Sequence, residues 1–110
     1  MCGILGLFNI KKGLEMRNEA LQMVRKIRHR GPDWSGSYNN DHCILMHERL
    51  SIVDVENGAQ PLYDSITKRV LAVNGEIYNH KEISLKLTNC HEWQTNSDCE
   101  VLLYLYDEYK

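Results

Sequence analysis

The sequence predicts an α+β domain, and three observations lead to this fold class. A short apolar run lies near the N-terminus, an amphipathic segment with helical spacing follows it, and several strand-like segments precede a second helical pattern near the C-terminus. Strands and helices in this order indicate layered α+β architecture. A chain of 110 residues suffices for one small domain with a modest core.

The first expected elements are a strand, a helix and a loop. Cys2–Phe8 is almost continuously apolar and rich in large side chains, which predicts a buried strand. An amphipathic helix is predicted over Met16–His29, where four apolar residues recur at helical spacing: Ala20, Met23, Val24 and Ile27. Gly31-Pro32 is expected to end this helix, and the polar, glycine-containing stretch Asp33–Asp41 is expected to be a loop.

The middle of the chain is expected to contain strands and turns. His42–Met46 and Ser51–Val53 are strand-like, and the charged segment His47-Glu48-Arg49 separates them. Arg69–Val73 is a further predicted strand. A turn before it is marked by two residues that favour turns: Gly58 and Pro61.

Two helices are predicted in the last third. A short helix is expected over Lys81–Leu87. Ser97-Asp98-Cys99-Glu100 has the form of a capping box. A last helix is predicted after it, because four hydrophobic residues follow at helical spacing: Val101, Leu102, Leu105 and Tyr109.

Composition excludes several classes of function. The net charge of −2 gives no electrostatic indication of binding to nucleic acid or to an anionic membrane. No apolar stretch approaches the ~20 residues of a membrane-spanning helix. The run Ile4–Phe8 also lacks the basic flank and the cleavage site of a signal peptide. We therefore expect a cytoplasmic protein.

The cysteines are Cys2, Cys43, Cys90 and Cys99. Because thiols stay reduced in the cytoplasm, we expect no disulfide bonds. A small Cys/His metal domain is the disfavoured alternative, since the sequence has no C-x-x-C or H-x-x-x-H pair. Cys43, Cys90 and Cys99 are interpreted as packing residues.

Cys2 is the first candidate for chemistry. Removal of Met1 would leave a thiol and a free α-amine on one residue. An α-amine has an ordinary pKa of about 7.7–8.0 and a thiol one of about 8.5, so the amine is well matched to take the thiol proton. Enzymes with N-terminal nucleophiles use this arrangement. The alternative is a packing cysteine that happens to be second in the chain.

Four other segments have both a structural and a functional interpretation. Asn74-Gly75 follows an apolar strand and is typical of a hairpin turn, but its amide groups also suit an oxyanion hole. Arg49 is a solvated charge or, in a pocket, a partner for a carboxylate. Asp98 complements a helix dipole or belongs to a site. Arg28–Asp33 is a phosphate-binding turn or a structural loop with an arginine–aspartate pair.

Six blocks of the sequence together resemble the amino-terminal glutaminase domain of glutamine-hydrolysing asparagine synthetases. In the family's order they are CGI at 2–4, RHRGPDWSG at 28–36, HERLSIVD at 47–54, GAQPLY at 58–63, NGEIYNH at 74–80 and SDCEVLL at 97–103. The HERLSIVD and NGEIYNH blocks favour this branch over amidophosphoribosyltransferases and glucosamine-6-phosphate synthases. The resemblance implies part of a four-layer αββα sandwich of the N-terminal-nucleophile hydrolase type.

The resemblance also implies roles in the hydrolysis of glutamine to glutamate and ammonia. Cys2 would attack the side-chain amide, with its own α-amine as base, and Asn74-Gly75 would form the oxyanion hole. Arg49 would pair with the α-carboxylate of the substrate and Asp98 with its α-ammonium. Further residues would complete the substrate pocket: Leu50, Ile52, Val53 and Glu76.

Two departures from the family bear on these expectations. The ATP-binding synthetase domain with its SGGxDS loop has no counterpart here, and neither do the later segments of the glutaminase domain, so residues 1–110 are expected to be its N-terminal portion. Glutamine hydrolysis would need no cofactor or metal, whereas ATP and Mg²⁺ would belong to the synthetase domain. The expected partners are glutamine, a synthetase domain or the rest of the glutaminase domain, and further copies in an oligomer. The alternative function is that of a noncatalytic remnant or interaction module.

Overall fold

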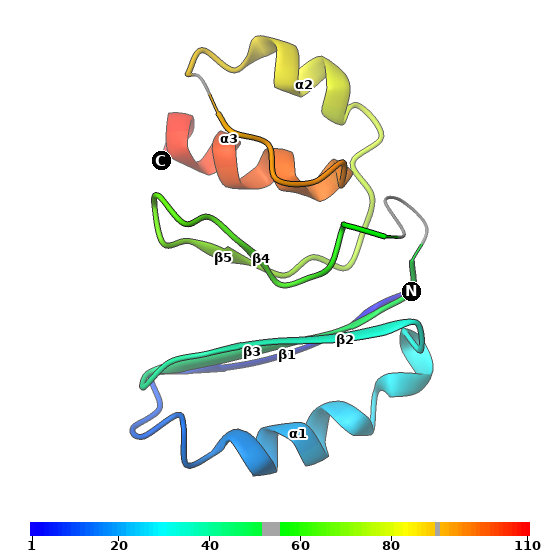
Figure 1. Cartoon of the computed structure of the whole chain (residues 1–110), viewed down its shortest axis with the longest axis vertical. Helices are drawn as coiled ribbons and strands as arrows, with labels where there is room; N and C mark the ends of the chain where they lie inside the picture. The colour runs from blue at the N-terminus through cyan, green and yellow to red at the C-terminus, as the bar shows by residue number, and fades with distance from the viewer. Residues whose placement is uncertain (52–55, 90) are drawn as a thin grey trace.

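A computed structural model describes residues 1–51, 56–89 and 91–110, and it confirms the α+β fold class. The elements are, in chain order, β1 (Gly3–Phe8), α1 (Arg17–Arg25), the 3-10 turn η1 (Arg28–Arg30), β2 (Trp34–Asn39), β3 (Cys43–Arg49), β4 (Leu62–Tyr63), β5 (Val70–Leu71), α2 (His80–Lys86), the 3-10 turn η2 (Asp98–Glu100) and α3 (Val101–Tyr109). They stack along the longest dimension of a molecule that measures 41 × 28 × 19 Å. Figure 1 shows α1, the sheet of β1, β3 and β2, the hairpin of β4 and β5, and then α3 and α2.

Strand β3 is the centre of the larger sheet. It pairs antiparallel with β1 on one side and with β2 on the other. The sequence predicted that His47-Glu48-Arg49 would interrupt the strands here, and this is wrong, because the three residues continue β3 and are buried. Their polar groups tolerate burial where they find partners. For example, Glu48 Oε2 accepts a hydrogen bond from Ser35 Oγ at 2.7 Å.

The predicted loop over Asp33–Asp41 is also wrong, because most of it forms β2. The whole strand pairs with β3, from Trp34 opposite Arg49 to Asn39 opposite Ile44. The polar side chains of this segment suggested a loop, but an edge strand tolerates polar side chains when its backbone is paired. Within β2, the carbonyl of Gln60 fills the space that a Cβ atom on Gly36 would need. Gly36 therefore lets the segment before β4 approach the sheet.

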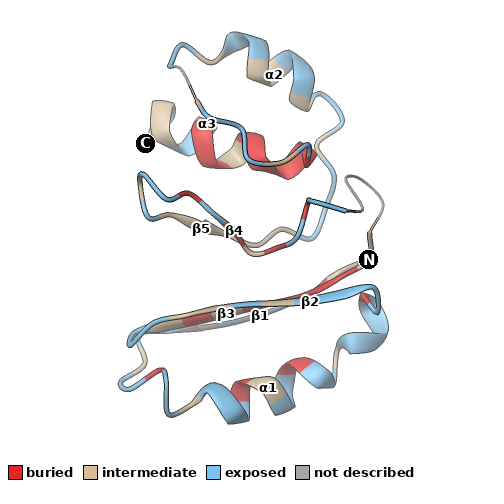
Figure 2. Ribbon diagram, in the orientation of Figure 1, coloured by how far each residue is buried: buried red, intermediate tan, exposed pale blue. Residues whose placement is uncertain are grey.

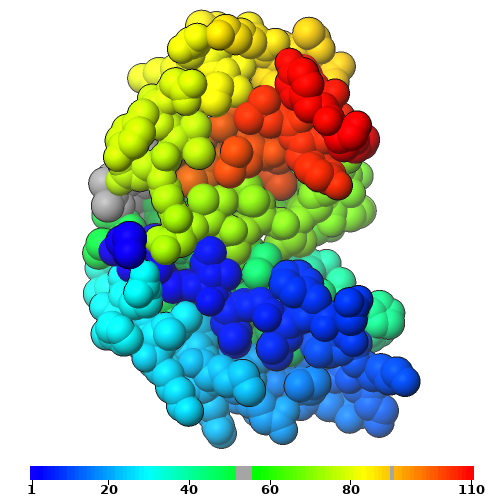
Figure 3. Space-filling model, turned by 180° about the vertical axis from the view of Figure 1, so that it is seen from behind, coloured from blue at the N-terminus to red at the C-terminus, as the bar shows by residue number. Residues whose placement is uncertain are grey.

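Strand β1 forms where it was predicted, but the expectation of a buried strand is wrong, because β1 lies at an edge of the sheet and Gly3 is its only buried residue. Burial alternates along it, with Leu5 and Leu7 packed against the α1 side. Ile4 and Phe8 point to the other side and are 38% and 65% exposed. Figure 3 shows β1, in dark blue, along the surface at the back of the molecule.

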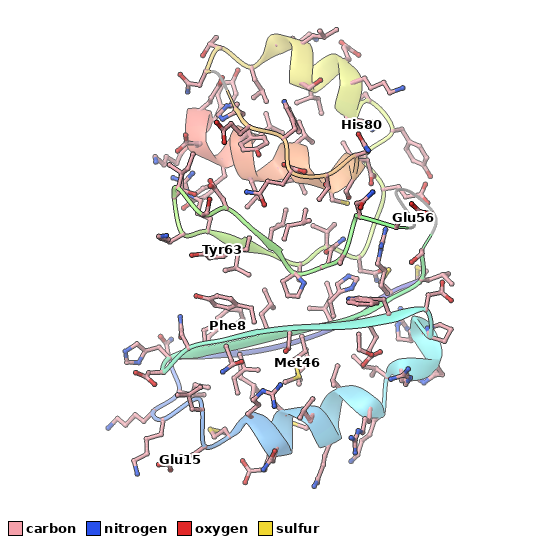
Figure 4. The ribbon with its side chains drawn as sticks, in the orientation of Figure 1. Phe8, Glu15, Met46, Glu56, Tyr63 and His80 are labelled. Atoms are coloured by element: carbon pink, nitrogen blue, oxygen red, sulfur yellow. The ribbon has the colours of Figure 1, made fainter. Side chains whose placement is uncertain are left out.

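Helix α1 covers one face of the larger sheet and builds the first hydrophobic cluster. Its buried residues Ala20 and Val24 pack against Ile44 and Met46 of β3. Figure 4 shows Met46 on the α1 side of the sheet and Phe8 on the opposite side. The predicted apolar face is right except for Met23, which is 46% exposed. The helix ends at Arg25, before the predicted end at His29, because the chain tightens into η1.

Helix α3 builds the second cluster with the β4–β5 hairpin. The cluster contains Leu62, Cys99, Leu103 and Tyr104, and Figure 2 shows the buried residues of α3 in red. The predicted face is therefore partly wrong. Leu103 and Tyr104 are buried, whereas Leu102 and Leu105 are only half-buried and Tyr109 is exposed. The Tyr104 ring can be buried because its hydroxyl has a hydrogen-bond partner there: it donates to Glu100 Oε1 at 2.8 Å.

The capping box before α3 is half formed. Ser97 Oγ accepts from the backbone N–H of Cys99 at 3.3 Å, as an N-cap side chain should. In a complete capping box the Glu100 carboxylate would accept a hydrogen bond from the backbone N–H of Ser97. Here it accepts from the backbone N–H groups of Gln94 and Thr95 instead. Glu100 thus fixes the loop that precedes the helix.

Of the remaining predicted elements, one helix is confirmed and one strand is shorter than expected. Helix α2 lies within one residue of its predicted bounds. The strand predicted over Arg69–Val73 is only the short β5, paired with an unpredicted β4. Of the predicted strand over Ser51–Val53, only Ser51 lies within the described residues. Along the described part of the chain, no helix is long and apolar enough to span a bilayer.

Candidate functional site

A cavity of about 260 Å³ lies where the end of β3 meets the segment after β5. Its volume is near the lower end of the ~300–1,000 Å³ range of small-molecule pockets, which suits a ligand of amino-acid size. Residues from five separate parts of the chain line it: Met1, Cys2, Arg49, Leu50, Gln60, Val73, Asn74, Gly75, Glu76, Tyr78, Ser97, Asp98 and Cys99. The cavity is therefore a product of the tertiary fold.

Cys2 is held at the cavity by the backbone of Leu50 and by the side chain of Arg30. The N–H of Leu50 donates to Cys2 Sγ at 3.4 Å, and the thiol lies 3.7 Å from the Leu50 carbonyl oxygen. Arg30 Nε donates to the Cys2 carbonyl at 3.1 Å. The half-buried thiol thus has a defined position although it is second in the chain.

Asn74 and Gly75 line the cavity, but not as a hairpin turn. Neither is among the described residues with positive φ, which a two-residue type I′ hairpin requires at both positions. The chain bends here and continues into a loop and then α2, rather than into a second strand. A Cβ atom on Gly75 would have no atom within 4 Å, so this residue faces open space.

The cavity carries opposite charges from different elements. Arg49, at the end of β3, is 5% exposed, and Asp98, at the start of η2, is 6% exposed. Asp98 Oδ2 accepts from the backbone N–H of Ile77 at 2.5 Å, which ties η2 to the segment after Gly75. A guanidinium and a carboxylate on one cavity suit the two charges of a free amino acid. The interpretation of Arg49 as a solvated charge is therefore wrong, because its side chain is buried at the cavity. Asp98 lines the same cavity, as its interpretation as a site residue requires.

The other predicted pocket residues divide into two groups. Leu50 and Glu76 line the cavity. Ile52 and Val53 lie outside the described residues. Every predicted site residue that the structure describes therefore lines the same cavity.

Several residues of the site were not predicted from the sequence. Gln60, Val73 and Tyr78 line the cavity, and Cys99, interpreted as a packing residue, lines it as well. Burial, with the nearby charge of Asp98, raises the pKa of Cys99 to about 12, so its thiol stays protonated and the packing interpretation holds. Its sulfur donates weakly to the Gly75 carbonyl at 3.6 Å.

His47 contacts the cavity residue Val73 and was also missed. Its Nε2 lies 2.9 Å from the carbonyl oxygen of Val73. Burial lowers the pKa of His47 below its ordinary value. Side chains alternate along a strand, so His47 lies on the same face of β3 as Arg49 two residues later. This two-residue spacing was the feature of the sequence that could have placed His47 near the site.

The Arg28–Asp33 segment is a structural loop, as one interpretation predicted, but its bonds differ from those expected. Asp33 Oδ2 accepts from the backbone N–H of Ser51 at 2.9 Å. Arg28 donates to Ser35 Oγ at 3.2 Å, and Arg30 reaches Cys2. The expected arginine–aspartate pair is wrong, because these backbone and hydroxyl groups are the partners.

The described part of the chain contains free thiols and no metal-binding cluster. Cys2, Cys43 and Cys99 are free thiols, and Cys90 lies outside the described residues. Within residues 1–51, 56–89 and 91–110, no group of three His, Cys, Asp or Glu side chains is arranged to hold a metal ion.

Comparison with known proteins gives the family. The family model of the glutamine amidotransferase domain matches the whole chain, residues 1–110. The chain belongs to this family. As a glutamine amidotransferase domain, it is similar to asparagine synthetase B [glutamine-hydrolyzing] of Escherichia coli (strain K12), with 57% identity over 98% of the chain and 20% of the relative.

Two eukaryotic relatives support the same branch of glutamine amidotransferases. Asparagine synthetase [glutamine-hydrolyzing] of Zea mays is 49% identical over 99% of the chain and 19% of its own length. The probable asparagine synthetase [glutamine-hydrolyzing] of Schizosaccharomyces pombe is 50% identical over 99% of the chain and 20% of its own length. The chain therefore spans about a fifth of the curated relatives that it matches, and its resemblance to asparagine synthetases is confirmed.

Proposed function

We propose that this domain hydrolyses glutamine to glutamate and ammonia, with Cys2 as an N-terminal nucleophile. One observation carries the proposal: the predicted site residues that the structure describes line a single cavity, with Cys2 Sγ against the Leu50 backbone. Membership of the glutamine amidotransferase family supports the choice of glutamine as substrate.

The proposed reaction proceeds through a thioester. After Met1 is removed, the α-amine of Cys2 takes the thiol proton, and the sulfur attacks the carboxamide carbon of glutamine. The amide of Asn74 and the N–H of Gly75 stabilise the oxyanion that develops on the carbonyl oxygen. The carbon–nitrogen bond then breaks, and ammonia leaves with the proton held by the α-amine. Water hydrolyses the γ-glutamyl thioester, which releases glutamate and restores the thiol.

Binding is proposed to use the charges of the cavity. Arg49 pairs with the α-carboxylate of glutamine, and Asp98 with its α-ammonium. Leu50 and Glu76 line the proposed pocket, and Ile52 and Val53 are proposed to complete it. This arrangement would select an α-amino acid over a simple amide.

The wider setting is also part of the proposal. The stacked helices and sheets are compatible with part of an αββα N-terminal-nucleophile sandwich. The ammonia would serve asparagine synthesis in a cytoplasmic enzyme, and residues 1–110 would be the N-terminal portion of its glutaminase domain. The domain would work with the rest of that domain and with a synthetase domain that binds ATP and Mg²⁺, whereas glutamine hydrolysis itself would need no cofactor.

The test compares two cysteine variants after mass spectrometry has established that Met1 is removed. Cys2→Ser should abolish glutamate release from glutamine, because the hydroxyl is a much weaker nucleophile than the thiol. Cys43→Ser should retain activity, since Cys43 lies at the far end of β3 and outside the cavity. Normal hydrolysis by Cys2→Ser, or by a form that verifiably retains Met1, would refute the mechanism. A wild-type protein with a free Cys2 amine and no activity would indicate the noncatalytic alternative.

A further inference from the structure

The peptide groups next to Asn74 are held by side chains instead of by a neighbouring strand. Strand β5 ends at Leu71, so Val73 lies outside the β4–β5 ladder. The N–H of Val73 donates to Gln60 Oε1 at 2.6 Å. Its carbonyl oxygen lies 2.9 Å from His47 Nε2. Both backbone polar groups of the residue before Asn74 are thus bound by side chains from other parts of the chain.

The geometry fixes the proton on His47. A carbonyl oxygen only accepts hydrogen bonds, so Nε2 must donate to Val73. His47 is 0% exposed, and its Nδ1 is buried with no hydrogen-bond partner among the described residues. Burial also lowers the pKa of the imidazole, which favours the neutral ring with its proton on Nε2 at neutral pH. Within the described part of the chain, the bond to Val73 is the only polar bond of this ring.

We propose that His47 is a positioning residue for glutamine hydrolysis, and that it acts with Gln60 to fix the Val73 peptide and hence the donors of Asn74 and Gly75. The inference rests on the proposed function, because it assigns these donors to an oxyanion hole. Such donors must lie about 2.7–3.1 Å from the developing charge. A segment that bends away from its strand has no ladder to hold it at that precision. The side chains of His47 and Gln60 take the place of the ladder.

Two amide variants of His47 distinguish the effect of losing the hydrogen-bond donor from the effect of losing the imidazole ring. In His47→Gln the side-chain nitrogen can reach the site of Nε2 and still donate to Val73, whereas in His47→Asn it reaches only the site of Nδ1. We expect His47→Asn to lower kcat for glutamate release by about 10- to 100-fold, as small misplacements of reacting groups do. KM should change much less, and His47→Gln should recover most of kcat. Equal rates in the two variants would overturn the proposal.

Hydrogen exchange of backbone amides tests the same proposal without reference to activity. His47→Asn should speed the exchange of the amides of residues 73–77 by about tenfold, the equivalent of one lost hydrogen bond. His47→Gln should leave them near the wild-type rate, and the amides of α1 should not change in either variant. Unchanged exchange in His47→Asn would overturn the positioning role. If wild-type protein releases no glutamate, the proposed function fails, whereas the exchange rates still decide whether His47 holds this segment.

Discussion

Asn74 is the residue whose substitution best separates catalysis from local structure. Its side-chain amide is proposed to donate to the oxyanion, and the bend it occupies makes no strand pair. Asn74→Ala should therefore lower kcat by about 100- to 1,000-fold, as the loss of one oxyanion donor does. KM should change less, because the donor acts mainly in the transition state. Steady-state glutaminase kinetics measure both quantities.

Asn18 provides a control for this substitution. It lies exposed on α1, away from the cavity, so Asn18→Ala should leave kcat unchanged. If Asn74→Ala lowers the unfolding temperature but not kcat, the residue is only structural.

Asp98 and its proposed ligand group can be tested with a substrate analogue. Glutaramate is glutamine without the α-amino group, so it cannot use an ammonium partner. Wild-type protein should prefer glutamine over glutaramate in kcat/KM, and Asp98→Asn should lose most of this preference. The asparagine oxygen can still accept from the N–H of Ile77, so the local bond is preserved.

Arg49→Lys serves as the companion variant in this experiment. It should raise KM for glutamine and glutaramate alike, because both retain the carboxylate and a lysine cannot form the forked pair. A preference for glutamine that survives in Asp98→Asn would remove Asp98 from the ammonium site.

The residues that could be predicted from the sequence are those with distinctive chemistry in a familiar order. Cys2, Arg49 and Asp98 stood out through their types and through the blocks that contain them. His47 and Gln60 could not be assigned, because each acts on the backbone of Val73, 26 and 13 residues away. The strand period places His47 on the same face as Arg49, but no local pattern identifies the distant peptide group that His47 or Gln60 binds.

The start of α3 depends on one buried carboxylate. Glu100 is 2% exposed and accepts from Gln94 N–H at 2.7 Å, Thr95 N–H at 2.8 Å and Tyr104 Oη at 2.8 Å. Glu100→Gln replaces one acceptor oxygen with an NH₂ group that faces these donors. We expect the free energy of unfolding to fall by about 1–3 kcal/mol, the cost of leaving buried polar groups unsatisfied. Urea denaturation followed by circular dichroism measures it.

Glu82→Gln is the matched control for the same chemical change. Glu82 pairs with Lys86 on α2 at 2.6 Å, but the two side chains are 63% and 70% exposed. A surface pair of this kind contributes less than about 1 kcal/mol. Equal losses in the two variants would show that Glu100 is no more than a surface charge.

The sequence predicted those helices and strands whose conformation follows from the local residue pattern. It missed those whose conformation depends on backbone pairing with a distant strand. Helix α2 follows from its own sequence, and β1 from its apolar run. The polar β2 and the charged end of β3 were missed, because their strand conformation comes from hydrogen bonds to partners elsewhere in the chain. Backbone pairing and buried partners for His47 and Glu48 override the preference of polar residues for loops.

The molecule leaves one apolar face of its larger sheet partly open. Figure 4 shows Phe8 on the face opposite α1, on the same side as Tyr63 of the hairpin. Phe8 is 65% exposed and Ile4 38% exposed, whereas the short β4 and β5 cover only part of this face. Exposed apolar residues beside an unpaired strand edge favour association.

We therefore expect the 110-residue chain to elute in size-exclusion chromatography above its monomer mass of 12.8 kDa. The double variant Ile4→Thr, Phe8→Thr should shift it toward the monomer, because threonine keeps the strand propensity and removes the apolar surface. Leu85→Gln is the control, since Leu85 is 87% exposed on α2, far from this face. A monodisperse wild-type monomer would contradict the prediction.

The position of the cavity has a thermodynamic consequence for the whole molecule. Cys2 and Arg49 belong to the part of the chain built on α1 and the larger sheet, whereas Asn74 and Asp98 belong to the part built on α3. An amino acid bound to both groups is a noncovalent crosslink between the two hydrophobic clusters. By mass action, a ligand at 100 times its Kd adds about 2.7 kcal/mol to the stability of the folded state. The folded fraction of the domain would then rise with the concentration of any amino acid that binds in the cavity.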